Sequence, residues 1–207
     1  MGYLRVFGLG IAAMALLAIV VAGSASAAVL CKNNTTTEGC SGIYKAGTTV
    51  HLQLVKNASL VLENAEFQTT ITGCSASTFE STTDKDGAEG VPVTFSVLLE
   101  SYKWTCTSPT STIAGGKYEI EWIPKTDNGT MKVTNFQVRV ETLFGPCIWG
   151  TGAAAIVYGT VVGGTPATVV VNNITLTPVA GAGCAKTVKM RGTYEFTSPN
   201  PLFIAKK

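Results

Sequence analysis

The sequence predicts an all-β protein: an antiparallel β-sandwich or a partly closed barrel of about ten short strands, cross-linked by disulfides. Three observations support this fold class. Apolar and polar residues alternate with period two in many segments, which is typical of strands with one buried face. The 207-residue chain contains 29 threonines and 22 glycines, which favour strands and turns over helices. Six cysteines follow an apolar N-terminal segment, as in exported domains with disulfides.

The first element, residues 1–27, is predicted to be a secretory signal peptide. Arg5 supplies a positive charge, residues 6–23 are apolar or small, and an Ala-Ser-Ala triplet then offers the small side chains that signal peptidase requires. Cleavage after Ala27 leaves residues 28–207 as a single secreted domain, with no membrane contact expected. An uncleaved membrane anchor is the alternative, because the apolar run is long enough to span a bilayer.

Strands with one buried and one solvent-exposed face are predicted along the rest of the chain. Alternating apolar positions predict them over 50–54, 118–122 and 188–196. Asn128-Gly129 predicts a type I′ hairpin, because both residues tolerate a positive φ. This turn would join the strand at 117–123 to the one at 130–142.

Two strands are expected to contain a β-bulge or a bend. Met131 and Val133 are apolar at odd positions, whereas Phe136, Val138 and Val140 are apolar at even ones. Since a strand keeps one face inward only while the parity holds, an extra residue is needed at 134–135. The same change of parity occurs around 172–173.

The cysteines indicate an oxidising, extracellular compartment, because an even number in an exported chain is typical of disulfides. Sequence alone leaves many connectivities open. We expect sequential pairing, in which Cys31 and Cys40 close a short loop. The expected bridges are Cys31–Cys40, Cys74–Cys106 and Cys147–Cys184.

Metal and cofactor motifs are scarce, and no cofactor is expected. Zinc sites need closely spaced Cys or His ligands, but the chain has no CxxC and a single histidine, His51. The weak candidate for a metal site is the acidic loop with Asp84, Asp86 and Glu89, whose oxygens suit Ca²⁺. It lacks the full EF-hand spacing, so a solvated hairpin loop is the default interpretation.

The search for catalytic residues is negative. The chain has no GxSxG elbow, no P-loop and no GxGxxG. His51 would have to serve as the base for a nucleophile, but it lies in an alternating strand on the expected polar face. Glu119 and Glu121 share a strand face, whereas glycoside hydrolysis needs carboxylates on both sides of a cleft. We therefore expect no enzymatic activity from these residues.

Two tryptophans stand two residues from a cysteine, Trp104 near Cys106 and Trp149 near Cys147. Positions two apart on a strand face the same way, so each indole is expected to pack beside a disulfide in the core. The functional alternative is an aromatic platform that stacks on sugar rings.

Charge excludes one class of partner. The net charge is only +2, and the basic residues are dispersed singly. A nucleic-acid surface would need clustered basic residues with interleaved aromatics, so no nucleic-acid partner is expected.

Short motifs stand at both ends and in the middle of residues 28–207. They are Leu30-Cys31-Lys32, Cys40, Tyr44 to Thr48, Trp104-Thr105-Cys106, and 192–203, which includes Thr197-Ser198-Pro199 and Pro201-Leu202. As a set they resemble a family of uncharacterised secreted actinobacterial proteins that begins LCK…C…Y..GT and ends TSP.PL. The resemblance implies export and a disulfide-bonded β fold, and it implies no activity, ligand or functional residue.

These observations lead to one leading hypothesis and one alternative. The leading hypothesis is an exported, non-catalytic β module of the cell envelope or extracellular space with a binding or structural role. Its candidate partners are a cell-wall or extracellular polysaccharide or a surface protein. The alternative is a carbohydrate-active hydrolase that uses carboxylates from separate strands.

Overall fold

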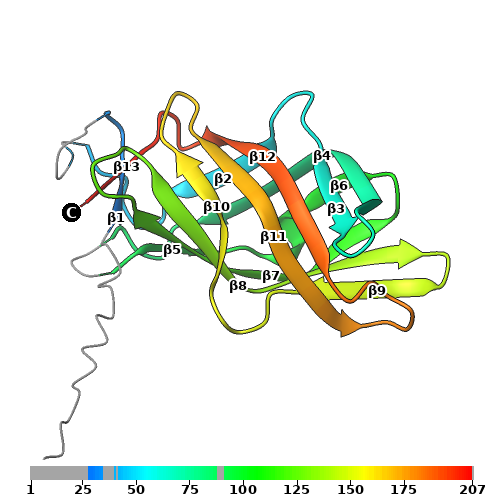
Figure 1. Ribbon diagram of the computed structural model, residues 1–207. Helices are drawn as coiled ribbons and strands as arrows, with labels where there is room; N and C mark the ends of the chain where they lie inside the picture. The colour runs from blue at the N-terminus through cyan, green and yellow to red at the C-terminus, as the bar shows by residue number, and fades with distance from the viewer. Residues whose placement is uncertain (1–27, 35–39, 41, 88–90, 207) are drawn as a thin grey trace, which may run out of the picture.

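The computed structural model describes residues 28–34, 40, 42–87 and 91–206, so the predicted signal peptide lies outside the described residues. The described part is almost entirely antiparallel β-structure, with one short 3₁₀ helix, η1 (Leu99–Ser101), and no α-helix (Figure 1). Its thirteen strands are β1 (Ala28–Cys31), β2 (Thr49–Leu54), β3 (Leu60–Asn64), β4 (Thr69–Thr82), β5 (Val93–Ser96), β6 (Lys103–Cys106), β7 (Thr110–Trp122), β8 (Gly129–Thr142), β9 (Gly145–Gly150), β10 (Ile156–Val162), β11 (Thr168–Ala180), β12 (Val188–Ser198) and β13 (Phe203–Lys206).

Five long strands form the frame of the main sheet: β4, β7, β8, β11 and β12, each of 11–14 residues. Between them, short strands lie end to end in pairs. β2 and β3 both pair with β12 on one side and β4 on the other, and β9 and β10 both pair with β8 and β11. One long strand is thus paired with two short ones in succession, which accounts for the larger number of strands than expected.

The main sheet curls round into a sandwich-like, partly closed barrel. β5 pairs with β7 and β6 pairs with β4, so these two short strands lie between β4 and β7. An isolated bridge joins Thr83 to Phe95, and the amide of Asp84 donates to the carbonyl of Thr94 at 2.7 Å. Closure is only partial, because among the described residues no ladder joins β6 to β7 and β5 meets the end of β4 through that one bridge, which fits the sandwich-like outline in Figure 1.

The interior of the barrel is filled with aromatic side chains from opposite walls. Phe95 stacks on Tyr118 with ring centroids 5.3 Å apart, and Tyr118 meets Tyr158 edge-on at 5.2 Å. Phe79 adds a further contact to Tyr194 at 5.8 Å. These residues alternate with outward-facing polar residues along their strands, as the period-two patterns predicted.

The two predicted bends are confirmed. Asn135 and Asn173 both adopt positive φ, at 55° and 52°. The inward positions of β8 change parity at Asn135, and the pairing of β11 with β12 shifts register between Val171 and Ile174. Asparagine tolerates this left-handed conformation better than most non-glycine residues. The single left-handed residue bends each strand and changes which of its positions face inward.

The hairpin between β7 and β8 forms where it was predicted, but its turn type was predicted wrongly. Gly129 is already paired with Trp122 in the ladder, and the positive φ lies at Lys125, at 64°. Gly129 is needed for close approach instead, since a Cβ there would lie 2.9 Å from the carbonyl oxygen of Glu121 and 3.2 Å from Ile204. Close packing against β7 and β13 therefore explains this glycine.

A separate two-stranded ladder of β1 and β13 lies at one end of the barrel (Figure 1). The amide of Ile204 donates to the carbonyl of Asp127 at 2.9 Å, which ties β13 to the β7–β8 turn. Leu30, Leu202 and Ile204 are fully buried and join the main core. The chain segment after β12 thus leads into a strand that covers this end.

The cysteines pair sequentially, as predicted: Cys31–Cys40, Cys74–Cys106 and Cys147–Cys184. The second bridge links directly opposite residues of β4 and β6, and the third ties β9 to the β11–β12 loop. Three disulfides are consistent with an extracellular protein. No helix among the described residues has the length and apolar character needed to cross a bilayer.

Candidate functional site

A polar groove of about 590 Å³ lies on the outer surface where the barrel closes, and we call it the seam groove. Its wall on one side comes from β2 and β4, and on the other from β5, η1 and β6. It is lined by His51, Thr78, Glu80, Ser81, Thr82, Asp84, Ser96, Leu98, Glu100, Ser101 and Lys103.

Strand register places the charged residues of the seam groove side by side. His51 on β2 is directly opposite Glu80 on β4, and Thr78 on β4 is directly opposite Lys103 on β6. Directly opposed residues on one face have Cβ atoms about 5 Å apart, and diagonal neighbours lie within reach of long side chains. The side chains of His51, Glu80 and Lys103 and the hydroxyl of Thr78 therefore lie together on one surface of the sheet.

Hydrogen bonds across the seam fix the groove's two walls relative to one another. The hydroxyl of Ser81 donates to the carbonyl of Ser96 at 2.5 Å, and the hydroxyl of Ser96 lies 3.4 Å from a carboxylate oxygen of Asp84. On the other side of the groove, Nδ1 of His51 is hydrogen-bonded to the hydroxyl of Thr197. The groove is thus built from paired strands on one side, and from the segment after β5 with η1 on the other.

The chemistry of the seam groove suits a ligand with many hydroxyl groups. Glu80, Asp84 and Glu100 offer carboxylates that accept hydrogen bonds, Lys103 offers a donor, and serine and threonine hydroxyls do both. No tryptophan, tyrosine or phenylalanine is among the lining residues. Recognition here would rest on directional hydrogen bonds to polar groups rather than on stacking of sugar rings.

The structure brings two residues considered in the sequence, His51 and Asp84, into this site and leaves others outside. His51 does lie on the wet face of its strand, within the groove. Glu121 pairs with Lys132 at 2.7 Å, and Glu119 lies 4.0 Å from Lys117. These two glutamates are therefore the solvated, ion-paired face of β7.

The acidic loop contributes one residue to the groove. Asp84 lines it, and Asp86 follows on the same loop, whereas Glu89 lies outside the described residues. Within residues 28–34, 40, 42–87 and 91–206, no group of three or more His, Cys, Asp or Glu side chains is arranged to hold a metal ion. The calcium hypothesis, which needs Glu89, stays a prediction.

The tryptophans follow the core-packing interpretation. Trp149 is buried and donates its indole N–H to the carbonyl of Ala185 at 2.9 Å, beside the disulfide partner Cys184. Trp104 is half-buried against Tyr102, and its indole nitrogen is buried without a hydrogen-bond partner. Neither indole lines the seam groove.

Sequence reasoning did not single out Glu80, Glu100 or Lys103. One local signal was present, because Thr78, Glu80 and Thr82 alternate with the buried Phe79 and mark the outward face of β4. The grouping itself depends on the register between β2, β4 and β6, which are far apart in the chain. Comparisons of the chain with protein-family models, with curated proteins and with solved structures find no match, so the assignment rests on this geometry alone.

Proposed function

We propose that this protein is an exported, non-catalytic β module that binds a polysaccharide of the cell wall or extracellular space in the seam groove. One observation carries the proposal: His51, Glu80 and Lys103 stand together with several hydroxyl groups on hydrogen-bonded strands of one sheet. Rigid presentation lowers the entropy lost on binding, because the side chains are already positioned. Export is supported by the leader sequence and by the three disulfides.

A pull-down of the oxidised protein on purified cell-wall and polysaccharide fractions tests this proposal. We expect retention on one fraction, and we expect Glu80→Gln/Lys103→Gln to weaken it about tenfold or more, since hydrogen bonds to charged groups are the strong ones. Glu119→Gln/Lys117→Gln is the matched control, because it removes one acid and one base from a different face.

The control variant should be retained like the parent protein. Retention of the parent on no fraction would contradict the proposal, as would equal retention of the groove variant and the parent. Equal losses in both double variants would indicate a general charge effect rather than a site.

A second candidate function, hydrolysis of a glycan, is favoured by a specific observation. Glu80 on β4 and Glu100 on η1 come from separate segments and line one groove, as paired carboxylates of glycoside hydrolases do. New reducing ends released by the parent protein, and lost on Glu80→Gln or Glu100→Gln, would establish this activity. Binding without release would leave the non-catalytic module.

A further inference from the structure

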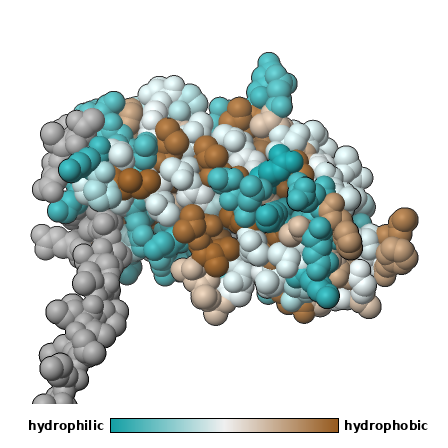
Figure 2. Space-filling model, in the orientation of Figure 1, coloured by the Kyte–Doolittle hydropathy of each residue, from teal (hydrophilic) through white to brown (hydrophobic). Residues whose placement is uncertain are grey.

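The tip of the β8–β9 hairpin carries two large apolar side chains that the fold leaves in solvent. Leu143 is 99% exposed and Phe144 is 86% exposed. The tip lies at the end of the barrel opposite to β1 and β13, and it projects from that end in the space-filling view (Figures 1 and 2). Packing in the interior of the protein therefore does not explain why these two positions hold Leu and Phe.

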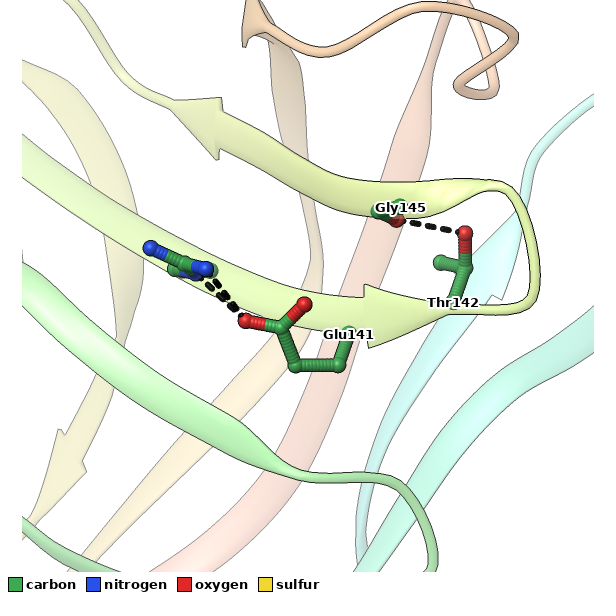
Figure 3. A network of polar contacts seen from close by, with 4 residues as sticks. Glu141, Thr142 and Gly145 are labelled. Carbon is green, nitrogen blue, oxygen red and sulfur yellow. Dashed lines mark hydrogen bonds and ion pairs between the residues drawn. The ribbon is translucent and has the colours of Figure 1, made fainter.

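Turn chemistry does not explain them either. Thr142 and Gly145 are paired across the hairpin, and the hydroxyl of Thr142 donates to the carbonyl of Gly145 at 2.7 Å (Figure 3). The same hydroxyl accepts the amide of Phe144 at 3.2 Å. The turn is thus closed by its flanking residues, while its central positions, where Gly, Asn, Asp, Ser or Pro are usual, hold Leu and Phe.

The hairpin that presents this tip is firmly held. β9 lies between β8 and β11, and the Cys147–Cys184 bridge ties its start to the β11–β12 loop. Just before the tip, Arg139 and Glu141 form an ion pair at 2.5 Å, so their charges compensate each other. The tip is consequently a rigid apolar protrusion rather than a flexible loop.

The other loops at this end share the same low charge. Phe67 in the β3–β4 turn is 73% exposed and Val179 near the end of β11 is 51% exposed. The loops 65–68, 107–109, 143–144 and 181–187 contain one acidic residue, Glu66, and one basic residue, Lys186. This end of the molecule can therefore approach an uncharged surface with little loss of charge hydration.

A hollow of about 530 Å³ adjoins the tip. It is lined by Ile71, Ser108, Pro109, Glu141, Thr142, Leu143 and Phe144. Its volume lies within the range of small-ligand sites. The four apolar residues can contact a hydrocarbon chain, and the one carboxylate, that of Glu141, is paired with Arg139.

From these observations we propose that the β8–β9 tip inserts into the surface of a lipid layer. The two tip side chains offer roughly 400 Å², about half of the ~800 Å² per partner that a stable protein interface buries. A lipid layer needs no complementary pocket and takes up apolar tips at its headgroup boundary. The near absence of charge fits zwitterionic lipid better than an anionic surface.

Flotation of the full, oxidised protein with phosphatidylcholine vesicles tests the proposal. We expect binding to these vesicles that changes little with salt or with an equal admixture of phosphatidylglycerol. Leu143→Ser/Phe144→Asn should reduce the bound fraction about tenfold or more. This variant should melt at or above the parent temperature, because it places turn-forming residues at a turn.

The matched control is Val157→Thr/Val162→Thr, which removes exposed apolar surface from β10 while keeping β-branched side chains. It should float like the parent. The proposal is overturned if the parent binds neither vesicle, if binding needs the anionic lipid and disappears with salt, or if the control loses as much binding as the tip variant. A dimer in sedimentation that the tip variant abolishes would also overturn it, with a second copy as the occupant.

Discussion

Ser77 and Tyr194 illustrate how this barrel accommodates polar groups in its interior. Both side chains are buried, and their hydroxyl oxygens lie 2.8 Å apart. A buried hydroxyl without a partner costs free energy, whereas a buried pair satisfies itself. The two residues come from β4 and β12, so this hydrogen bond also links two strands that lie on either side of β2 and β3.

The pair leads to a prediction for a double-mutant cycle. Tyr194→Phe alone should lower the free energy of unfolding by about 1–3 kcal/mol, because it leaves the Ser77 hydroxyl buried and unpaired. Ser77→Ala should have a similar effect for the converse reason. The double variant should lose clearly less than the sum of the two, as measured by urea denaturation. Additive losses would show that the hydroxyls do not stabilise each other.

At the scale of strands, local patterns predicted what depends on local backbone geometry. The changes of parity around Asn135 and Asn173 located both bends, because inward positions every two residues are a property of one strand. Sequential cysteine pairing was also expected correctly. The Asn128-Gly129 turn type was predicted wrongly because Gly129 lies in the ladder, closely packed against Ile120 and Glu121 on β7 and Ile204 on β13, which the dipeptide alone does not reveal.

The closure of the barrel and the seam groove could not be predicted from such patterns. Partial closure depends on two short strands, β5 paired with β7 and β6 paired with β4, which lie between these two long strands. His51, Glu80 and Lys103 come together through pairings between segments that are tens of residues apart. The alternation of residues predicts which side chains of a strand face solvent, but it does not predict which residue of another strand lies opposite each of them.

The disulfides allow a prediction at this scale. Cys74–Cys106 closes a loop of 32 residues and Cys31–Cys40 a loop of 9. In the loop-entropy account, removing them costs about 4 and about 3 kcal/mol, respectively. Cys74→Ala/Cys106→Ala should therefore melt below Cys31→Ala/Cys40→Ala in calorimetry. The reverse order would mean that strain or contacts at these bridges, rather than loop length, determine their effect.

For the whole molecule, the aromatic interior makes stability depend on alkaline pH. Burial is the main cause that raises the pKa of Tyr102, Tyr118, Tyr158 and Tyr194 above the usual value of 10.0. The hydroxyls of Tyr102 and Tyr118 lie 2.6 Å apart, so ionising one also disturbs its neighbour. In the unfolded chain all four would ionise near their ordinary pKa.

Above pH 10 the unfolded state therefore releases protons that the folded state keeps. The stability due to these four groups is complete below that pH and is lost as the pH rises towards the raised pKa values, by ~1.4 kcal/mol per pH unit for each tyrosine. Thermal melts between about pH 8 and pH 12 should show this fall, with tyrosinate absorbance increasing only as near-ultraviolet circular dichroism is lost. Tyr102→Phe/Tyr118→Phe removes two of the four hydroxyls and should roughly halve the slope. Reversible ionisation of all the tyrosines near pH 10 in a native molecule would contradict a closed, dry interior, because burial is what raises these pKa values.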